Sequence, residues 1–264
     1  MDFPEPEAPR IATLSPGWTD RLMPRKISNA PLGPSIRFSR PVVSSTGLED
    51  ASMFRFLMAV VLALLWSVSG ASNSPDPHRI LVFGDSLSAA HGIAGDVGWV
   101  SLLEQRLDER DAPWRVRNAS VGGETTAGGR TRLPALLEEF QPDLVILELG
   151  GNDGLRGLSL RAMRENLEAM LDASESAGAK VLLAGIQIPP NYGPVYTERF
   201  AAVFADLAAE RGLAFVPFLL EGIALEPEMM LEDGIHPSAA AQARILQNVW
   251  DELEALVERV EQGA

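Results

Sequence analysis

Residues 80–88 read Ile-Leu-Val-Phe-Gly-Asp-Ser-Leu-Ser and decide the fold of this 264-residue chain. The apolar run Ile80–Phe83 is typical of a strand that is buried on both faces, as in a parallel sheet. Gly84 gives the backbone room to turn, and a serine directly after such a strand presents its hydroxyl at the carboxyl-terminal edge of the sheet. One alternative stays open here, in which Asp85 or Ser86 only caps a following helix.

Similar apolar runs recur along the chain, separated by amphipathic segments. Strands are predicted at Ile80–Phe83, Arg115–Asn118, Leu144–Leu149, Lys180–Ile186 and Ala214–Phe218. Helices are predicted at Gly98–Glu109, Gly128–Glu139, Ser159–Ala177, Val195–Arg211 and Ser238–Glu261. This alternation implies right-handed crossovers and a parallel sheet covered on both faces. We therefore predict the α/β class: a three-layer α/β/α sandwich with a five-stranded parallel sheet, flavodoxin-like, whose reactive groups gather at the carboxyl ends of the strands.

The first 71 residues lack this alternation. Residues 1–52 are rich in Pro, Ser and Arg, show no sustained period, and are predicted to be a disordered extension. Residues 53–71 have the layout of a signal peptide, with Arg55, the apolar run Phe56–Trp66, and small side chains at the end. The run is too short to cross a bilayer core of about 30 Å as a helix.

This layout predicts a protein that is exported to the periplasm or the medium. A signal sequence normally starts a chain, so Met53 is the expected start, and residues 1–52 then reflect a gene start placed too early. An uncleaved anchor or a buried helix is the alternative. After cleavage we expect a linker at residues 72–78, a folded domain at residues 79–261 and no stable membrane insertion.

Composition narrows the class of partner. Residues 72–264 hold 30 acidic and 15 basic residues, and such a surface repels nucleic-acid phosphates and anionic lipid headgroups. The chain has no cysteine, which removes thiolate nucleophiles and Cys-based zinc sites. The metal motif His-Glu-x-x-His and the phosphate motif Gly-x-x-x-x-Gly-Lys-Ser/Thr are also absent. We expect no metal, no cofactor and no nucleic-acid partner, and a monomer.

A general base that titrates near neutrality must come from three histidines. His78 lies in a polar segment and His91 in a glycine-rich stretch, so both are interpreted as solvated loop residues. His236 differs because Asp233, three residues earlier, can accept its Nδ1 proton and hold the Nε2 lone pair toward a nucleophile. The structural alternative is that this segment only starts the last helix, with Ser238 as its N-cap.

Acyl transfer also needs hydrogen-bond donors where negative charge develops on the carbonyl oxygen. Residues 118–126 follow the second predicted strand, and Gly123 among them can aim a bare backbone N–H into the site. Residues 148–154 follow the third, and Asn152 can contribute a side-chain amide. Each signal alone is ordinary turn chemistry. Together with Ser86 and the pair Asp233 and His236, they place four catalytic residue types after strands one, two, three and five.

These motifs resemble the sequence blocks of the GDSL family of hydrolases and, within it, of the SGNH group. The matching blocks are Gly84-Asp-Ser-Leu87, Asn118–Thr126, Gly150-Gly-Asn-Asp153 and Asp233-Gly-Ile-His236. The resemblance implies the SGNH hydrolase fold for residues 79–261. It implies that Ser86 is the nucleophile, His236 the base and Asp233 its orienting partner. It also implies an oxyanion hole made of the Ser86 N–H, the Gly123 N–H and the Asn152 side chain.

The resemblance covers residues from about Ile80 to Val257. Within the family, this stretch is most similar to the periplasmic thioesterase, lysophospholipase and arylesterase members. The resemblance implies that residues 154–158 and 189–192 line or gate an acyl pocket. The predicted substrate-binding residues are Asp85, Gly154, Leu155, Pro190, Tyr192 and Ile235. Two departures concern acyl preference: Glu124 stands where the family has Asp, and His91 where an aromatic residue is common.

The predicted function is therefore hydrolysis of small-molecule acyl esters or thioesters through an acyl-serine intermediate. One alternative is a short-chain carbohydrate acetylesterase of the same family. A second is a non-catalytic flavodoxin-like binding domain in which residues 122–129 cradle a phosphate. A third, a phosphatase with Asp85 as nucleophile, lacks a second nearby acid and a clear magnesium cluster.

Overall fold

The computed structural model describes residues 76–110 and 112–263. The predictions for residues 1–52, 53–71 and 72–75 lie outside the described residues. The sheet has the order β2-β1-β3-β4-β5, and every pair of neighbours is parallel. Its strands are β1 (His78–Gly84), β2 (Trp114–Asn118), β3 (Leu144–Glu148), β4 (Lys180–Ala184) and β5 (Ala214–Val216). The predicted fold class is confirmed.

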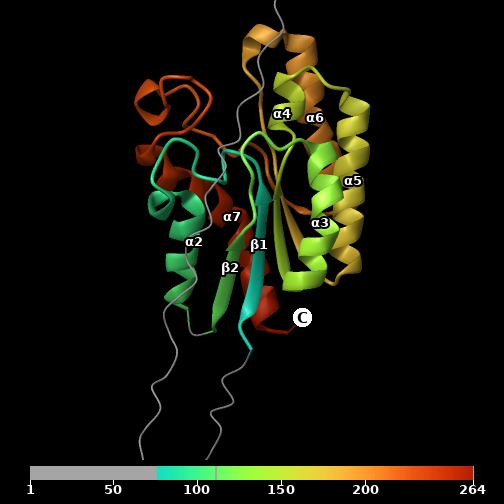
Figure 1. Ribbon diagram of the computed structural model, residues 1–264, viewed down its shortest axis with the longest axis vertical. Helices are drawn as coiled ribbons and strands as arrows, with labels where there is room; N and C mark the ends of the chain where they lie inside the picture. Colours follow the sequence, from blue (N-terminus) through green and yellow to red (C-terminus); the bar gives the residue numbers. More distant parts are fainter. Residues whose placement is uncertain (1–75, 111, 264) are drawn as a thin grey trace, which may run out of the picture. The chain divides into compact units, whose positions relative to one another are not determined.

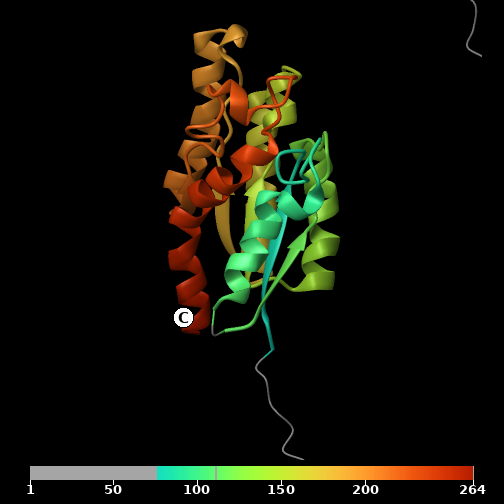
Figure 2. The same cartoon turned by 90° about the vertical axis from the view of Figure 1, so that its left-hand side faces the viewer.

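Helices cover both faces of the sheet, as Figure 1 shows. They are α2 (Trp99–Asp108), α3 (Thr126–Phe140), α4 (Gly151–Leu155), α5 (Leu160–Ser176), α6 (Pro194–Arg211) and α7 (Gln242–Glu261). Short 3₁₀ turns lie at Gly95–Val97, Pro190–Tyr192, Pro227–Met229 and Ala239–Ala241. Helices α3, α5 and α6 lie on one side of the sheet, and Figure 2 views the opposite side, with α2 and α7 in front.

Two apolar layers hold the three tiers together. Along β1, Ile80 and Val82 point into the layer shared with α2 and α7. Leu81 and Phe83 point into the layer shared with α3, α5 and α6. All four are fully buried, which explains why this strand reads as a continuous apolar run. Each such side chain contributes about 1.5–3 kcal/mol relative to exposure, so β1 is anchored firmly beneath its loop.

Several predicted boundaries differ from those observed, for local reasons. Helix α3 begins at Thr126, two residues before the predicted start, because the Thr125 side chain caps it by accepting the Gly128 N–H at 3.3 Å. The last helix begins at Gln242 rather than at Ser238. Ser238 does not cap it, because its hydroxyl donates to the Glu228 carbonyl instead. Helix α4 has five residues, too few for a helical period to be visible in the sequence.

The strand order creates a topological switch point. Strands β2 and β3 lie on opposite sides of β1, so the chain leaves β1 in one direction and returns on the other. In doubly wound sheets the loops beyond this point separate and leave room for a site. Across residues 76–110 and 112–263, no helix is both long enough and apolar enough to cross a membrane.

Candidate active site

Ser86, His236 and Asp233 form a continuous hydrogen-bonded line at the carboxyl-terminal edge of the sheet. Ser86 Oγ lies 2.9 Å from His236 Nε2, across 150 positions of sequence. His236 Nδ1 lies 2.6 Å from Asp233 Oδ2. An ionised carboxylate can only accept, so Nδ1 carries the proton in this pair and Nε2 is left to accept from the serine hydroxyl. This is the geometry in which an imidazole can act as base for a serine.

The segment before α7 holds the imidazole in a tight loop. Residues Met230 and Pro237 form an antiparallel bridge, and the Leu231 N–H donates to the His236 carbonyl at 2.8 Å. Gly234 adopts a φ of 64°, which favours glycine, at the turn of this loop. The loop therefore holds the backbone of His236 in place before the last helix begins.

The Asp233 carboxylate is strongly bound although it is partly exposed. Its Oδ1 accepts the backbone N–H groups of Ile235 and His236, each at 2.9 Å. The backbone N–H of His236, then its ring, and then the backbone N–H of Ile235 hold the pKa of Asp233 well below its ordinary value of 3.8. Asp233 is therefore an anion throughout the neutral range and accepts the Nδ1 proton of His236.

The turn after β1 carries Ser86 and contains no helix. Residues 85–94 form turns, and the next regular segment is the 3₁₀ turn that starts at Gly95. The capping alternative for Asp85 or Ser86 is therefore wrong. Asn118 Nδ2 donates to the Ser88 carbonyl at 2.8 Å and braces this turn from the end of β2. Asn118 opens one of the sequence blocks above, and its bracing role was not predicted.

Gly123 lies in a loop that approaches the nucleophile. A Cβ at the neighbouring Gly122 would lie 4.0 Å from Ser86 Cβ. Gly123 has a φ of 77°, a conformation that other residues rarely adopt. Its carbonyl accepts from Arg156 Nη2 at 3.1 Å, so a side chain beyond α4 ties the two predicted oxyanion loops together. Among the hydrogen bonds of residues 76–110 and 112–263, the N–H groups of Ser86 and Gly123 donate to no protein atom.

Asn152 occupies the first turn of α4, beside Asp85. Its Nδ2 donates to Asp85 Oδ2 at 3.0 Å, which leaves the second amide hydrogen for another acceptor. The prediction that Asp85 contacts the substrate needs correction: its side chain is buried and bonded to Asn152 and to the Leu87 N–H. Burial raises the pKa of Asp85 from 3.8 to about 6, against the opposing hydrogen bonds from Leu87 and Asn152.

The amino terminus of α3 is already occupied by protein groups. Asp153 accepts the Thr126 N–H at 2.9 Å and the Thr126 hydroxyl at 2.6 Å. Gly129 packs inside the protein, where an added Cβ would lie 2.4 Å from Leu149. A carboxylate therefore sits where the binding-domain alternative needs a phosphate, and residues 122–129 do not form the phosphate cradle of that alternative.

The predicted substrate-binding residues are spread over several loops. The Tyr192 hydroxyl donates to the Leu155 carbonyl at 2.9 Å, which joins the two predicted pocket segments. Gly154 is buried beneath Phe200, whereas Pro190, Tyr192 and Ile235 are exposed. An apolar hollow of about 390 Å³ lies beside Tyr192, and it is lined by Leu160, Tyr192, Gly193, Pro194, Val195, Tyr196 and Arg199. Of the predicted set, only Tyr192 lines it.

His91 lies beside the His236 imidazole. It is exposed, as expected of a loop residue, but its ring centroid is 4.3 Å from that of His236. The interpretation of His91 as only a solvated residue missed this contact. The one signal in the sequence was its departure from the aromatic residue common at this position. No cluster of three metal-ligating side chains occurs in the part of the chain that the structure describes.

Comparison with known proteins agrees with this geometry. Residues 82–244 match the GDSL-like lipase/acylhydrolase family, and the chain belongs to that family. The predicted class, a hydrolase of carboxylic esters or thioesters, is confirmed.

Individual relatives cover most of the described domain. Esterase TesA of Pseudomonas aeruginosa is 53% identical over 178 residues, which span 67% of this chain and 89% of that protein. The thioesterase 1/protease 1/lysophospholipase L1 of Escherichia coli K12 is 40% identical over 206 residues, which span 78% of this chain and 96% of that protein. A crystal structure of TesA superposes with a TM-score of 0.66 at 52% identity and covers 68% of this chain and 99% of that one.

Proposed function

We propose that the protein hydrolyses acyl esters and thioesters by ping-pong acyl transfer through Ser86. The observation that carries the proposal is the unbroken line Ser86 Oγ–His236 Nε2–Asp233 at 2.9 and 2.6 Å. A serine hydroxyl is a poor nucleophile because it keeps its proton at neutral pH. An adjacent base can remove that proton as the oxygen attacks. The names of the relatives, esterase, arylesterase and thioesterase, agree with the proposed reaction.

In the first half-reaction, Ser86 Oγ attacks the carbonyl carbon while its proton passes to His236 Nε2. The Asp233 carboxylate stabilises the imidazolium that forms. The negative charge on the former carbonyl oxygen is met by the N–H groups of Ser86 and Gly123 and by the Asn152 amide. His236 then returns the proton to the leaving alcohol or thiol, and the acyl group stays on Ser86.

In the second half-reaction, water replaces the alcohol or thiol. His236 takes a proton from the water as it attacks the acyl carbon, and the same three donors stabilise the second oxyanion. Collapse of this intermediate releases the carboxylic acid and returns the proton to Ser86 Oγ. The steps use only side chains and backbone groups of this chain.

We further propose that the acyl chain lies along Leu155, Pro190, Tyr192 and Ile235. Ile235 is 41% exposed directly beside His236, and Tyr192 is 39% exposed. Exposed large apolar side chains next to a polar reaction centre suit a ligand with an apolar tail and a polar end. The bond from Tyr192 to Leu155 keeps these two segments together while a chain is bound.

The test is a substrate panel on the wild type and on Ser86→Ala. The panel holds p-nitrophenyl esters of acetyl and long acyl groups, an acyl-CoA and a lysophospholipid. We expect Ser86→Ala to lose about 10⁶ in kcat, since removing the nucleophile disables the whole triad. Equal activity in both proteins would overturn the proposal, and activity on acetyl esters alone would favour the carbohydrate acetylesterase alternative.

We also propose that the enzyme works outside the cytoplasm as a monomer, after removal of residues 53–71. The support is the order of basic, apolar and small residues in that segment. Amino-terminal sequencing of protein from the periplasm tests the first part, with a start at residue 72 as the expected result. Sedimentation of the same material tests the second.

A further inference from the structure

Beneath the nucleophile lie two buried carboxyl groups that the mechanism above does not use. Glu148 is the last residue of β3, and Asp85 follows the last residue of β1. Their residues are 0% and 2% exposed. Carboxyl groups are almost never fully buried unless they are bonded, so the partners of these two identify what they do.

Glu148 holds the turn that carries Ser86 from both sides. Its Oε2 accepts the Asp85 N–H at 3.1 Å and the Ser88 hydroxyl at 2.7 Å. One donor lies immediately before Ser86 in the chain and the other two residues after it. A single oxygen thus fixes the turn at two points, and Ser86 lies between them.

Gly84 makes this approach possible. It pairs with Glu148 in the register of β1 and β3, and a Cβ at position 84 would lie 2.4 Å from Glu148 Oε2. Real Cβ atoms essentially never come so close, and the carboxyl group could not move away without losing both hydrogen bonds. The glycine before the nucleophile is therefore required by the carboxyl group of β3.

The second carboxyl group extends the contact to the oxyanion hole. The Asp85 backbone N–H donates to Glu148, and the Asp85 side chain accepts hydrogen bonds from the Leu87 N–H and from Asn152 Nδ2, each at 3.0 Å. A continuous chain of contacts therefore runs from β3 through the nucleophile turn to the amide of Asn152. Ser86, which attacks the carbonyl carbon, and Asn152, which stabilises the oxyanion that forms, are therefore both held by contacts that begin at Glu148.

We propose that Glu148 is a positioning residue, which as a neutral carboxylic acid holds Ser86 and, through Asp85, Asn152 in the geometry of acyl transfer. This inference rests on the proposed function. Two adjacent negative charges at this depth would oppose the oxyanion that forms above them. Burial and then the charge of Asp85 raise the pKa of Glu148 well above its ordinary value of 4.5, which agrees with a neutral group.

The two oxygens of Glu148 differ in a way that suits this state. Oε2 accepts both hydrogen bonds, as a carbonyl oxygen can. Oε1 has no hydrogen-bond partner among residues 76–110 and 112–263, so no donor there stabilises negative charge on it, which agrees with a neutral group. A glutamine side chain keeps an uncharged accepting oxygen in place of Oε2, and its amide nitrogen, with two N–H donors, takes the place of Oε1.

The test compares Glu148→Gln with Glu148→Leu in the full-length enzyme. We expect Glu148→Gln to keep kcat within about threefold, and Glu148→Leu to lose about 100-fold in kcat with little change in KM, because a misplacement of about 1 Å costs that much. The rate at which a fluorophosphonate labels Ser86 should fall in parallel. Labelling reads the position of the nucleophile directly, which loss of stability alone does not change.

Two further variants keep the result interpretable. Leu253→Ala removes a buried side chain of α7 away from the nucleophile turn, and should lower Tm while kcat of the folded enzyme stays unchanged. Ser88→Ala removes one of the two donors with little change in volume, and should lower kcat even if Glu148→Leu does not fold. It should also lower the labelling rate.

Three outcomes would overturn the inference. They are wild-type kcat and labelling in Glu148→Leu, wild-type kcat and labelling in Ser88→Ala, and a loss in Glu148→Gln as large as that in Glu148→Leu, which would mean that the ion is required. Failure of the proposed function looks different, because the wild type itself would then not be labelled at Ser86.

Discussion

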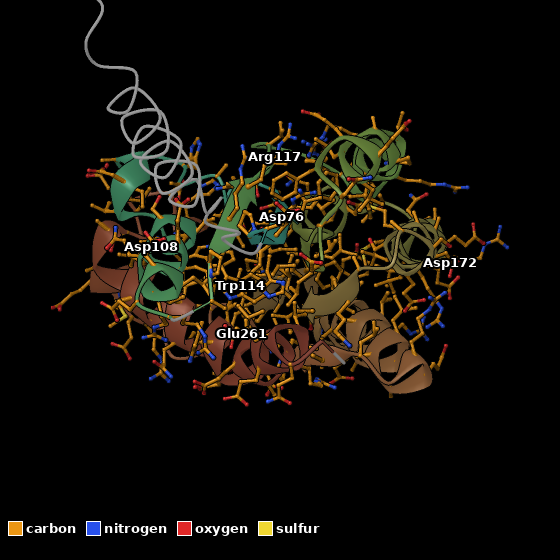
Figure 3. The ribbon with its side chains drawn as sticks, turned by 90° about the horizontal axis from the view of Figure 1, so that it is seen from below. Asp76, Asp108, Trp114, Arg117, Asp172 and Glu261 are labelled. Atoms are coloured by element: carbon orange, nitrogen blue, oxygen red, sulfur yellow. The ribbon has the colours of Figure 1, made fainter. Side chains whose placement is uncertain are left out.

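The two ends of the sheet each hold a carboxylate with a lowered pKa, yet only one of them lies in the candidate active site. At the amino-terminal edge, labelled in Figure 3, Glu261 accepts two bonds from Arg110, each at 2.8 Å, and one from Trp114 Nε1 at 2.9 Å. These bonds, from Arg110 first, lower the pKa of Glu261 below its ordinary value of 4.5. At the carboxyl-terminal edge, Asp233 is bound by His236 and by backbone N–H groups.

The difference lies in the partner rather than in the carboxylate. Arg110 carries its charge at every accessible pH, so its pair with Glu261 persists wherever Glu261 is ionised and ties α7 to the loop before β2. An imidazole can both accept and donate a proton, and the second nitrogen of His236 faces the Ser86 hydroxyl. A lowered carboxylate pKa therefore points to a tight structural bond, and it points to catalysis only where the partner can exchange a proton.

The largest difference in kcat should appear when each of the two carboxylates is replaced, in separate variants, by the matching amide. Asp233→Asn should lower kcat by about 10⁴, because an amide no longer holds the imidazole in the required tautomer. Glu261→Gln should leave kcat unchanged and lower Tm. Steady-state kinetics and thermal denaturation of both variants check this, and equal kcat values would remove Asp233 from the triad.

The pair of Arg110 and Glu261, at the amino-terminal edge of the sheet, allows a test of stability against pH. Since the pKa of Glu261 is lowered in the folded state, its stabilisation is fully present above about pH 4.5 and is lost as the pH falls through the folded-state value. The Tm difference between wild type and Glu261→Gln should therefore be constant at neutral pH and shrink below pH 4.5. A difference that grows in acid would contradict the assignment.

The next largest effect concerns two asparagines, Asn152 in the candidate active site and Asn248 in the scaffold. Asn152→Ala should lower kcat by about 10²–10³ at nearly constant KM, because it removes a donor to the oxyanion. Asn248 is the matched control, since its Nδ2 bonds the carbonyls of Leu219 and Glu221 in the scaffold. Asn248→Ala should lower Tm and leave kcat alone. A larger change in KM than in kcat for Asn152→Ala would indicate substrate binding instead.

The smallest effect concerns two histidine ring pairs. The His91 and His236 rings form a tilted pair with centroids 4.3 Å apart, and the His78 and Trp114 rings form one at 4.9 Å at the opposite end. Ring pairs contribute about 0.5–1.5 kcal/mol, so His91→Ala should lower kcat by at most about tenfold, and His91→Phe should restore it. His78→Ala should leave kcat unchanged. Identical kinetics for His91→Ala and wild type would show that the contact does not orient the base.

The centres of the strands could be predicted because their pattern is local. Ile80–Phe83 is apolar throughout, since both faces of β1 are buried. Strands β3 and β4 were predicted too long, because Leu149 and Ile186 are buried without belonging to them, whereas β1 and β2 extend beyond the predicted Ile80–Phe83 and Arg115–Asn118. Within the sheet, buried apolar residues belong to strands. Just beyond the strand ends, apolar side chains are still buried against α-helices although their backbone has left the sheet.

Within the site, prediction succeeded where neighbours in sequence are neighbours in space. Asp233 lies three residues before His236, so their contact needs only one tight turn. Gly84 illustrates the opposite case, because its importance was visible but its reason was not. We expected it to free the backbone for a turn, whereas it makes room for Glu148, a residue 64 positions away that only the pairing of β1 with β3 brings beside it.

The sequence by itself determined the alternation of buried strands and amphipathic helices, the acidic charge of the domain and the identity of its reactive groups, since these depend on residue type and short spacings. Only the tertiary structure decided that Ser86 meets His236 across 150 residues, that the His91 ring lies beside the His236 ring and that the Asp85 side chain is bonded to Asn152. The physical reason is the strand order: parallel strands deliver distant loops to one edge of the sheet, and no local pattern records which loops will touch there.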